Sequence, residues 1–519
     1  MAENVSNNKR IAKNTLFLYF RMILIMGVTL YTSRVVLDKL GIVDYGLYAT
    51  VGSAVGMLSF LNGTLSTGTS RFLTYELGAG NKERLKNTFS TAFYTHLILA
   101  FIVILAMETV GVWFFYNKLE IPAERLDACM WVLQFSILTT VVAITQVPYT
   151  AAVMAHEHMG IYAYVSIFEA IAKLLVCYLL TISALDRLVF YAALIAAVQL
   201  ITAMFYRFYC ISKFEESKLR WIFDKGILRS LMSFSGWNIM ANITETLKLQ
   251  GIIVLLNMFF SAPVVAAQAL ANQVSAAMMQ FVNNFRTALN PQIIKLYAAG
   301  DREGSKQLTL KTTVYCFDLI LMLGLPAIMI MNQLLDLWLV EVPEYAVIFI
   351  QYIIVRNIIG TFSAAFYIPM MAANRIKNNS MAAVYLGIGE FVLLYILLKL
   401  GFGVMWVQYM SLFLVFGFSF VVKPYILYKE IDYTIKELLG CYWNCAKVLL
   451  LAITIALPTF LLLGEGMFSS AIKGLNAFMA VVIASYVFLD KSAKEKLHSF
   501  VLQKIRGLKK YAIYRFFIR

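Results

Sequence analysis

Long apolar runs separated by short polar loops form the main pattern of this chain. Each run is close to the roughly 20 residues that a helix needs to cross the hydrocarbon core of a membrane. The runs are continuous, whereas a membrane β-barrel would show short segments in which apolar and polar residues alternate. The pattern therefore predicts an all-α polytopic membrane protein with about 14 transmembrane helices. Their expected ranges are 14–36, 45–69, 88–115, 128–150, 159–183, 186–206, 230–257, 262–286, 311–333, 345–367, 379–399, 403–423, 443–463 and 468–489.

Composition agrees with this pattern. Of the 519 residues, 61% are hydrophobic and 14% are charged, and the mean hydropathy is +0.75. Soluble globular proteins are nearer half apolar. The six cysteines lie in or beside the apolar runs, so we expect buried thiols that act as small apolar residues.

Basic residues are distributed unevenly among the loops. Most of the 44 lysines and arginines lie near the two ends of the chain and in every second loop, for example from Arg286 to Lys311 and from Lys423 to Lys447. Cytoplasmic loops of membrane proteins carry such an excess, so we expect both termini in the cytoplasm. This explains most of the net charge of +15 without a nucleic-acid partner. The basic C-terminal tail is expected to lie on anionic membrane lipids, and the alternative is a solvated tail without function.

Two loop motifs recur along the chain. AGNKERLK at 79–86 matches AGDREGSK at 299–306, and VPYTAAVMA at 147–155 resembles IPMMAANRI at 368–376. In the same register, Glu169 corresponds to Glu390. Each unit would hold six helices, which predicts two parallel repeats around a central cavity. The expected organisation is a six-helix lobe at 1–220, a second at 221–440, and two appended helices with a basic tail at 441–519.

Eight charged residues fall inside the predicted transmembrane segments. A charge at the centre of a bilayer costs about 2.5–3.5 kcal/mol on insertion scales, and such residues usually face a cavity or a partner. The cations are Arg21, Lys173, Lys248 and Arg356, and the acids are Glu169, Glu245, Asp318 and Glu390.

Two acid–cation pairs stand one helical turn apart. Glu169 and Lys173 are four residues apart, and Glu245 and Lys248 are three apart, so the members of each pair share a helix face. Two interpretations stay open. The pairs can neutralise themselves and reduce the cost of insertion, or they can line a polar cavity between the lobes.

The other four charged residues lack such a partner in the sequence. Arg356 is expected to bind an anion in the cavity, because its planar fork suits phosphate; the alternative is a structural pair with Asp318 or Glu390. Arg21 is a further cavity cation, or it snorkels towards the cytoplasm. Asp318 and Glu390 are candidates for a proton or a sodium ion, against simple hydrogen bonding, and Glu169 and Glu245 are further candidates for ion coupling.

No catalytic constellation is present in the sequence. We find no phosphate loop, dinucleotide fingerprint, nucleophile elbow or metal-ligand spacing, so the chain is not expected to be an enzyme or to carry a cofactor or metal. His156 and His158 have the look of a metal pair, but no third ligand is near in the sequence, which favours an ordinary surface loop.

The segment LGIVDYGLYATVGSAVGMLSFLNGTLSTGTSRFLTYELGAGNKE (40–83) resembles the opening of polysaccharide flippases of the O-antigen and capsule type. These belong to the superfamily of multidrug, oligosaccharidyl-lipid and polysaccharide exporters, which also contains the multidrug extrusion transporters. The resembling elements are Asp44 to Tyr48, Gly63, Arg71 and the Gly80-Asn81 turn. The organisation into six, six and two helices extends the resemblance, since such flippases often have fourteen helices and the drug extruders typically have twelve.

The resemblance implies an alternating-access flippase in the bacterial inner membrane. Its substrate would be an undecaprenyl-pyrophosphate-linked oligosaccharide that moves from the inner to the outer leaflet, coupled to H⁺ or Na⁺. Arg21, Lys173, Lys248 and Arg356 would hold the pyrophosphate. A polysaccharide polymerase and assembly proteins would be partners. Because one chain contains both lobes, we expect a monomer.

Three other classes of protein remain as alternatives. A cation-coupled multidrug efflux antiporter of the same superfamily predicts a cavity dominated by acids, whereas the internal cations and acids here are balanced. A membrane-embedded glycosyltransferase or polymerase predicts an acid cluster on a large outer loop, and the outer loops are short. A non-transporting scaffold would not need charged residues at mid-membrane in both repeats.

Overall fold

The computed structural model describes most of the chain. Its backbone covers 2–156, 158–182, 185–373, 375–491, 494–495 and 498–499. Its side chains cover the same residues except 2–22, 61–65, 67, 159, 162–163, 232–241, 287–288 and 291.

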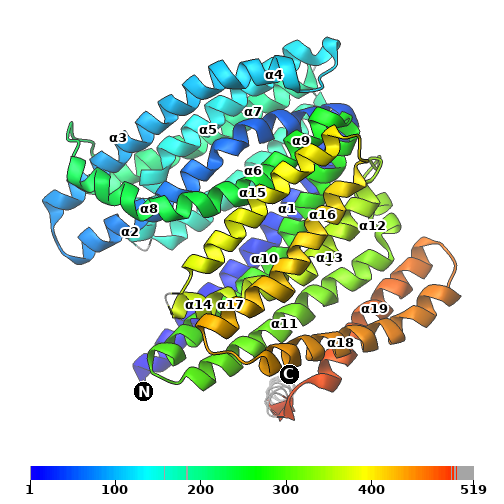
Figure 1. Ribbon diagram of the computed structural model, residues 1–519. Helices are drawn as coiled ribbons and strands as arrows, with labels where there is room; N and C mark the ends of the chain where they lie inside the picture. Colours follow the sequence, from blue (N-terminus) through cyan, green and yellow to red (C-terminus); the bar gives the residue numbers. More distant parts are fainter. Residues whose placement is uncertain are drawn as a thin grey trace, which may run out of the picture. The chain divides into compact units, whose positions relative to one another are not determined.

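Every predicted transmembrane segment falls on helix, and the described residues form no strand (Figure 1). Ten helical stretches of the described part are long and apolar enough to span a membrane. The other four predicted segments lie in α1 (Ala2–Gly56) with α2 (Phe60–Gly78), in α8 (Lys225–Thr246) with α9 (Ile252–Phe259), and in α10 (Ala262–Ala298). Gly41, at a φ of 80°, interrupts α1 between the first two segments. The prediction of an all-α polytopic membrane protein is confirmed.

The chain divides into two compact units that draw on several parts of the sequence. Unit 1 comprises Met1–Ala277, Leu335–Ile353 and Lys377–Leu414. Besides α1, α2, α8 and α9 it contains η1 (Met57–Ser59), α3 (Lys82–Ala106), η2 (Met107–Gly111), α4 (Val112–Lys118), η3 (Ala123–Arg125), α5 (Leu126–Ala155), α6 (Met159–Ile182), α7 (Arg187–Lys213), η4 (Glu215–Ser217), η5 (Leu247–Gly251) and α15 (Lys377–Lys399), with parts of α10, α12 (Met331–Trp338), α13 (Ala346–Ala365) and α16 (Met405–Gly417).

Small and branched side chains hold the core of unit 1 together. Helix α5 packs against α3 and α7, and α1 packs against α6. Leu47, Val51 and Val55 of α1 bury one face against Val132 and Leu133 of α5. Successive residues of this α1 face are four apart, which is the spacing that keeps side chains on one side of a helix.

Unit 2 comprises Met278–Leu334, Ile354–Ile376 and Val415–Arg519. The two appended helices of the sequence analysis are present as a hairpin that packs against α11 (Figure 1). Alanines at Ala477, Ala480 and Ala484 are fully buried in this packing and let the helices approach closely. The elements of the unit are α11 (Arg302–Met329), α14 (Tyr367–Ala372), η6 (Phe418–Val422), α17 (Lys423–Glu430), α18 (Ile435–Leu462) and α19 (Met467–Phe488), with parts of α10, α12, α13 and α16.

The two copies of the recurring loop motif build the same turn. Gly80 and Gly300 both have positive φ values, of 70° and 84°, which glycine adopts without strain. Asn81 and Asp301 then cap α3 and α11, each accepting a hydrogen bond from the backbone N–H three residues on, at 3.0 and 2.8 Å.

A lysine at the same motif position also reaches a later loop in each copy. Lys86 forms an ion pair of 3.1 Å with Glu215, in the loop after α7. Lys306 donates a hydrogen bond of 2.5 Å to the backbone carbonyl of Asp432, in the loop after α17. This shared arrangement is consistent with a repeat, while the lobe boundaries near 220 and 440 stay a prediction.

Candidate functional site

Helices α8 and α15 of unit 1 come into close contact beside two of the predicted charged residues, Lys248 and Glu390. A Cβ atom added at Gly387 of α15 would lie 2.1 Å from Cγ2 of Thr244 and 3.3 Å from Cε of Lys248. A Cβ atom at Gly251 would lie 2.7 Å from the ring of Phe391. Glycine at both positions therefore lets the two helices touch along their backbones, as small residues do in membrane proteins.

Lys248 lies within η5, a five-residue π-helical segment between α8 and α9. Such segments widen a helix locally and are frequent at functional sites. Its Cε atom packs beside Gly387 of α15.

Glu390 lies one turn beyond Gly387 on the buried stripe of α15. The stripe also contains Leu394 and Leu398, and Glu390 is only 5% exposed. Thus the structure brings Lys248 and Glu390, predicted from distant parts of the sequence, onto one helix pair. Glu245, one turn before Lys248, is exposed.

Glu169 and Lys173 form the pair that their spacing predicts. The Lys173 amine lies 2.8 Å from the Glu169 carboxylate, and the two side chains are 43% and 37% exposed. Both are on α6 in unit 1, and no described carboxylate other than Glu169 pairs with Lys173. The geometry supports self-neutralisation, and it leaves open whether the pair also lines a cavity.

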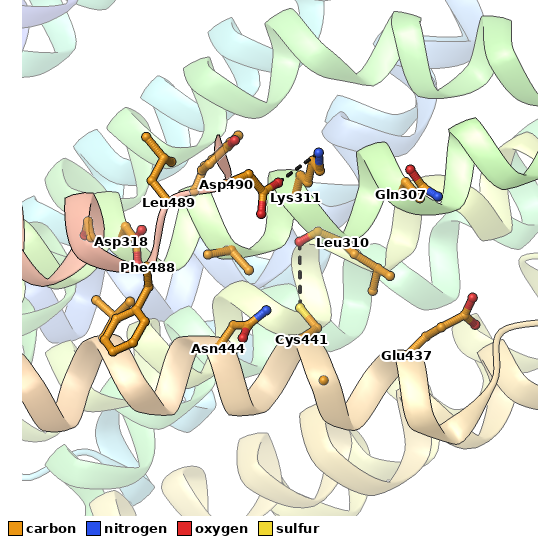
Figure 2. Close-up of a pocket in the computed structure, with 15 residues that line it drawn as sticks. Gln307, Leu310, Lys311, Asp318, Glu437, Cys441, Asn444, Phe488, Leu489 and Asp490 are labelled. Atoms are coloured by element: carbon orange, nitrogen blue, oxygen red, sulfur yellow. Dashed lines mark hydrogen bonds and ion pairs between the residues drawn. The ribbon is translucent and has the colours of Figure 1, made fainter. Parts of the chain in front are cut away.

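Asp318 of α11 lines a cavity of about 320 Å³ in unit 2, between α11, α18 and the end of α19 (Figure 2). It is 7% exposed, and its Oδ1 has no hydrogen-bond partner among the described residues. The side chain of Ser485 lines the same cavity, and an ion pair of 2.9 Å between Lys311 and Asp490 lies farther along its wall.

The remaining two predicted residues are less informative. Arg356 is a half-buried residue of α13 in unit 2, and it interacts with its surroundings. Arg21 belongs to α1, and its side chain lies outside the described residues. Their predicted role as cavity cations stays a prediction.

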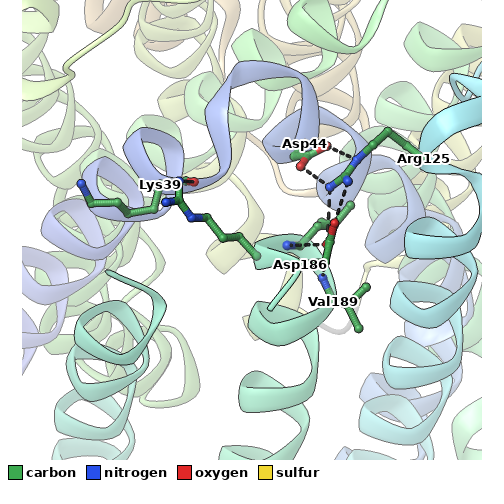
Figure 3. A network of polar contacts seen from close by, with 7 residues as sticks. Lys39, Asp44, Arg125, Asp186 and Val189 are labelled. Atoms are coloured by element: carbon green, nitrogen blue, oxygen red, sulfur yellow. Dashed lines mark hydrogen bonds and ion pairs between the residues drawn. The ribbon is translucent and has the colours of Figure 1, made fainter. Parts of the chain in front are cut away.

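A network around Arg125 gives the Asp44 motif a structural role that the sequence analysis missed (Figure 3). The Arg125 guanidinium donates from Nε to Asp44 Oδ1 at 2.9 Å and from Nη1 to Asp186 Oδ2 at 2.7 Å, and its Nη2 also contacts Asp44. Asp186 in turn caps α7, accepting from the N–H groups of Leu188 and Val189 at 3.1 Å. The network fastens α1 to the first turns of α5 and α7. A sequence signal could have identified Arg125, because it is an arginine in one of the predicted loops that hold few basic residues.

Electrostatics within this network differ between its two acids. Burial opposes the charge of Asp186, but hydrogen bonds from Arg125 and from the Val189 and Leu188 N–H groups outweigh it and hold the pKa of Asp186 below its usual value. Burial raises the pKa of Asp44 in spite of Arg125. Asp44 therefore takes up a proton before Asp186 as the pH falls.

Gly46 of the same motif has a separate reason to be glycine. A Cβ atom there would lie 2.1 Å from the backbone oxygen of Ala262, at the start of α10. The close approach of the two backbones excludes any side chain. Asp44 and Gly46 therefore account for much of the DYGLY motif through packing and ion pairing.

Unit 1 contains a cavity of its own, and this cavity is apolar. It has a volume of about 540 Å³ and is lined by residues of α1, α4, α5, α9 and α15, including Phe391. Lys118 is the charged residue of this lining, and its amine lies 5.9 Å from the ring of Trp113. Such a space suits an apolar chain better than a sugar.

The two histidines of the fourth connection are engaged in ordinary contacts. His156 bonds Glu216 at 2.5 Å and stacks on Phe214, and His158 bonds the Tyr209 hydroxyl at 2.8 Å. Among the described residues, no three histidine, cysteine or acidic side chains gather into a metal site. All six cysteines are buried, as predicted.

Comparison with solved structures identifies the fold. The chain is similar to the lipid II flippase MurJ in an inward closed conformation, with 12% identity, a TM-score of 0.69, and coverage of 91% of this chain and 98% of that one. An inward-facing multidrug resistance MATE transporter of the MOP superfamily matches with 11% identity, a TM-score of 0.61, and coverage of 79% and 96%. A MOP superfamily transporter from Pyrococcus furiosus matches with 13% identity, a TM-score of 0.58, and coverage of 81% and 96%.

No protein-family model and no curated protein matches the sequence. The ten membrane-spanning stretches and these structural neighbours together describe a multi-pass membrane protein with the fold shared by MurJ and the MATE transporters.

Proposed function

We propose that the protein is an alternating-access flippase for an undecaprenyl-pyrophosphate-linked oligosaccharide, a precursor of surface polysaccharide. It moves the glycan from the inner to the outer leaflet of the bacterial inner membrane, with both termini in the cytoplasm. Cationic side chains hold the pyrophosphate, the polyprenyl tail stays in lipid, and H⁺ or Na⁺ at membrane carboxylates drives the cycle. A polysaccharide polymerase and assembly proteins act beside it.

The observation that carries the proposal is the presence of two charged residues, Lys248 and Glu390, where α8 and η5 pack against α15. Glu390 is buried within a membrane helix, and Lys248 reaches the neighbouring turn of the same helix. Charged groups at this depth mark substrate or ion pathways. A glycan with two phosphates needs such a polar path, whereas a lipophilic substrate can cross without cations.

The fold likeness adds support. The flippase structure matches 91% of this chain, and the two other transporters match 79% and 81%. A fourteen-helix flippase would cover a larger share of this chain, because the drug extruders typically have twelve helices and so lack the two appended ones. At 11–13% identity, substrate and coupling rest on the residues of this chain.

A complementation experiment tests the proposal. In a bacterial strain that lacks this gene, we would compare surface glycan made with the wild-type protein and with Arg356→Ala and Arg356→Lys, after confirming equal membrane levels. We expect deletion to trap lipid-linked precursor on the inner leaflet. Arg356→Ala should reproduce that defect, and Arg356→Lys should trap less precursor than Arg356→Ala. Surface glycan that survives deletion of the gene would contradict the proposal.

The second candidate is a cation-coupled multidrug efflux antiporter. The apolar cavity of about 540 Å³ in unit 1 favours it, because lipophilic cations fit such walls. The same deletion strain separates the two functions. Altered drug tolerance with intact surface glycan would identify the extruder, and loss of glycan with unchanged tolerance would identify the flippase.

A further inference from the structure

Two cations lie inside unit 2 at positions that the sequence pattern assigns to basic loops. Lys423 is the first residue of α17 and is only 2% exposed. Arg286 is a half-buried residue of α10. Both cations contact the same stretch of chain, Arg286 at the backbone carbonyl of Ala364 and Lys423 at the ring of Tyr367 three residues on. In the described part of unit 2, neither cation forms an ion pair with a carboxylate.

Aromatic rings are the contacts that the structure gives Lys423. Its amine lies 5.4 Å from the ring centre of Tyr367 and 5.3 Å from that of Phe418. Such contacts favour a cation over an apolar group at this place. They leave the N–H groups of the ammonium without an acceptor among the described residues, and a buried ammonium needs one.

Arg286 is also incompletely satisfied. Its Nη2 donates to the backbone carbonyl of Ala364 at 2.8 Å, and its Nη1 donates to Asn283 at 3.3 Å. Its Nε is buried and has no partner among the described residues. One N–H of this cation is therefore available for an acceptor that the described residues do not supply.

A third donor stands one turn before Lys423. Ser419 is fully buried, and its hydroxyl has no partner among the described residues, while its backbone carbonyl accepts from Tyr442 at 2.8 Å. Residues four apart share a helix face, so the hydroxyl and the amine lie on the same side. Two cations and a hydroxyl, without a carboxylate to pair with, are the complement of an anion.

We propose that Arg286 and Lys423, assisted by Ser419, bind a phosphate-bearing anion. Arginine supplies a fixed fork of donors and lysine a point charge, which is the combination that phosphate groups take. The proposal deepens the proposed function and rests on it in one respect: the phosphate belongs to the pyrophosphate of the lipid-linked glycan. The site is separate from the α8–α15 contact and adds two cations to those expected from the sequence.

Direct binding tests the site without any transport. The full-length protein in nanodiscs of neutral lipid would be titrated with inorganic pyrophosphate while its thermal unfolding is followed. We expect a saturable rise of Tm in the wild type. The apparent Kd should increase at least tenfold in Arg286→Gln and in Lys423→Met. Lys447→Met, which removes a cation that also contacts aromatic rings in unit 2, is the matched control and should bind as the wild type does.

A second signature separates binding from structure. Without pyrophosphate, Lys423→Met should melt at or above the wild-type temperature, because an apolar chain replaces a buried charge. Lys423→Arg should restore binding. Unchanged pyrophosphate binding in both Arg286→Gln and Lys423→Met would overturn the site, and so would Tm losses in those variants that are equal with and without pyrophosphate.

Lipid arms of the same experiment identify the source of the phosphate. Nanodiscs doped with undecaprenyl pyrophosphate should raise the wild-type Tm, and nanodiscs doped with phosphatidylglycerol should not. An equal response to phosphatidylglycerol would overturn the assignment to the lipid-linked pyrophosphate. Pyrophosphate binding that depends on Arg286 and Lys423 in a protein that leaves surface glycan unchanged on deletion would support the anion site and contradict the proposed function.

Discussion

Glu169 and Glu390 would occupy equivalent places in the two repeats predicted from the sequence, but their surroundings differ. Glu169 is 37% exposed and is paired with Lys173, four residues on along its own helix. In the second repeat the position of that lysine is taken by Leu394, which is fully buried. Glu390 is 5% exposed on the same buried stripe.

The difference separates a self-contained pair from an acid that depends on other helices. The charge of Glu169 is balanced within one turn, so it can stay constant through a transport cycle. Glu390 is buried, and the neighbouring turn of its helix packs against Thr244 and Lys248. A carboxylate in that setting responds to protons, ions and helix movements. We therefore propose Glu390, ahead of Glu169, for the coupling role.

The largest expected difference in transport comes from neutralising each of the two acids separately. We expect Glu390→Gln to reduce transport at least about tenfold, because the interactions of a buried charged group are worth about 1.5–3 kcal/mol. Glu169→Gln should change transport much less. Initial rates of glycan appearance at the surface would be compared at equal protein levels. Equal losses in the two variants would remove the distinction between the repeats.

The next largest expected effect is a loss of stability when Gly387, one turn before Glu390, is replaced. Gly387→Ala would force Thr244 and Lys248 away from α15, at an expected loss of about 1–3 kcal/mol from overpacking. Gly389→Ala is the control, since a Cβ atom there meets nothing within 4 Å. Thermal unfolding in detergent should show a lower Tm for the first variant alone. Matching Tm values would mean that the two helices do not pack this closely.

The Arg125 network allows a test of stability that involves neither Glu169 nor Glu390. Arg125→Gln should destabilise the protein by about 1–3 kcal/mol, because two partly buried carboxylates lose their cation. The stabilisation through Asp186 is complete above its ordinary pKa and is lost as the pH falls through its lowered pKa. The gap in Tm between wild type and variant should therefore narrow on acidification. A gap that widens below neutral pH would contradict this assignment.

The smallest effect is expected for the pair in the first repeat. Exposed pairs at this spacing contribute about 0.3–0.5 kcal/mol. The double variant Glu169→Gln with Lys173→Met should therefore be close to the wild type in Tm and in transport. A transport defect in Lys173→Met that the double variant does not relieve would show instead that Lys173 contacts substrate.

The fold was predictable from the sequence because its signal is local. Each apolar run of membrane length predicts one helix by itself. The recurring motif at 79–86 and 299–306 indicates the same capped turn in both places. The Glu169–Lys173 pair was predictable for the same reason, since both residues share one helix face.

Contacts between distant segments were not predictable in this way. Nothing in the sequence says that Lys248 meets Gly387, or that Arg125 joins Asp44 to Asp186. Lys423 was counted with a basic loop because it stands at the end of the predicted segment 403–423. Its burial depends on the packing of α14, which holds Tyr367, against the adjoining η6 and α17, which are distant from α14 in the chain.

Transbilayer movement of the lipid-linked substrate tests the central claim most directly. Purified protein would be reconstituted into vesicles that contain a fluorescent oligosaccharide linked to undecaprenyl pyrophosphate, and the fraction reaching the opposite leaflet would be followed by a membrane-impermeant quencher. We expect movement with the wild-type protein, little with Glu390→Gln, and none in protein-free vesicles. A wild-type protein that leaves the glycan in place while it extrudes a lipophilic cation would contradict the account.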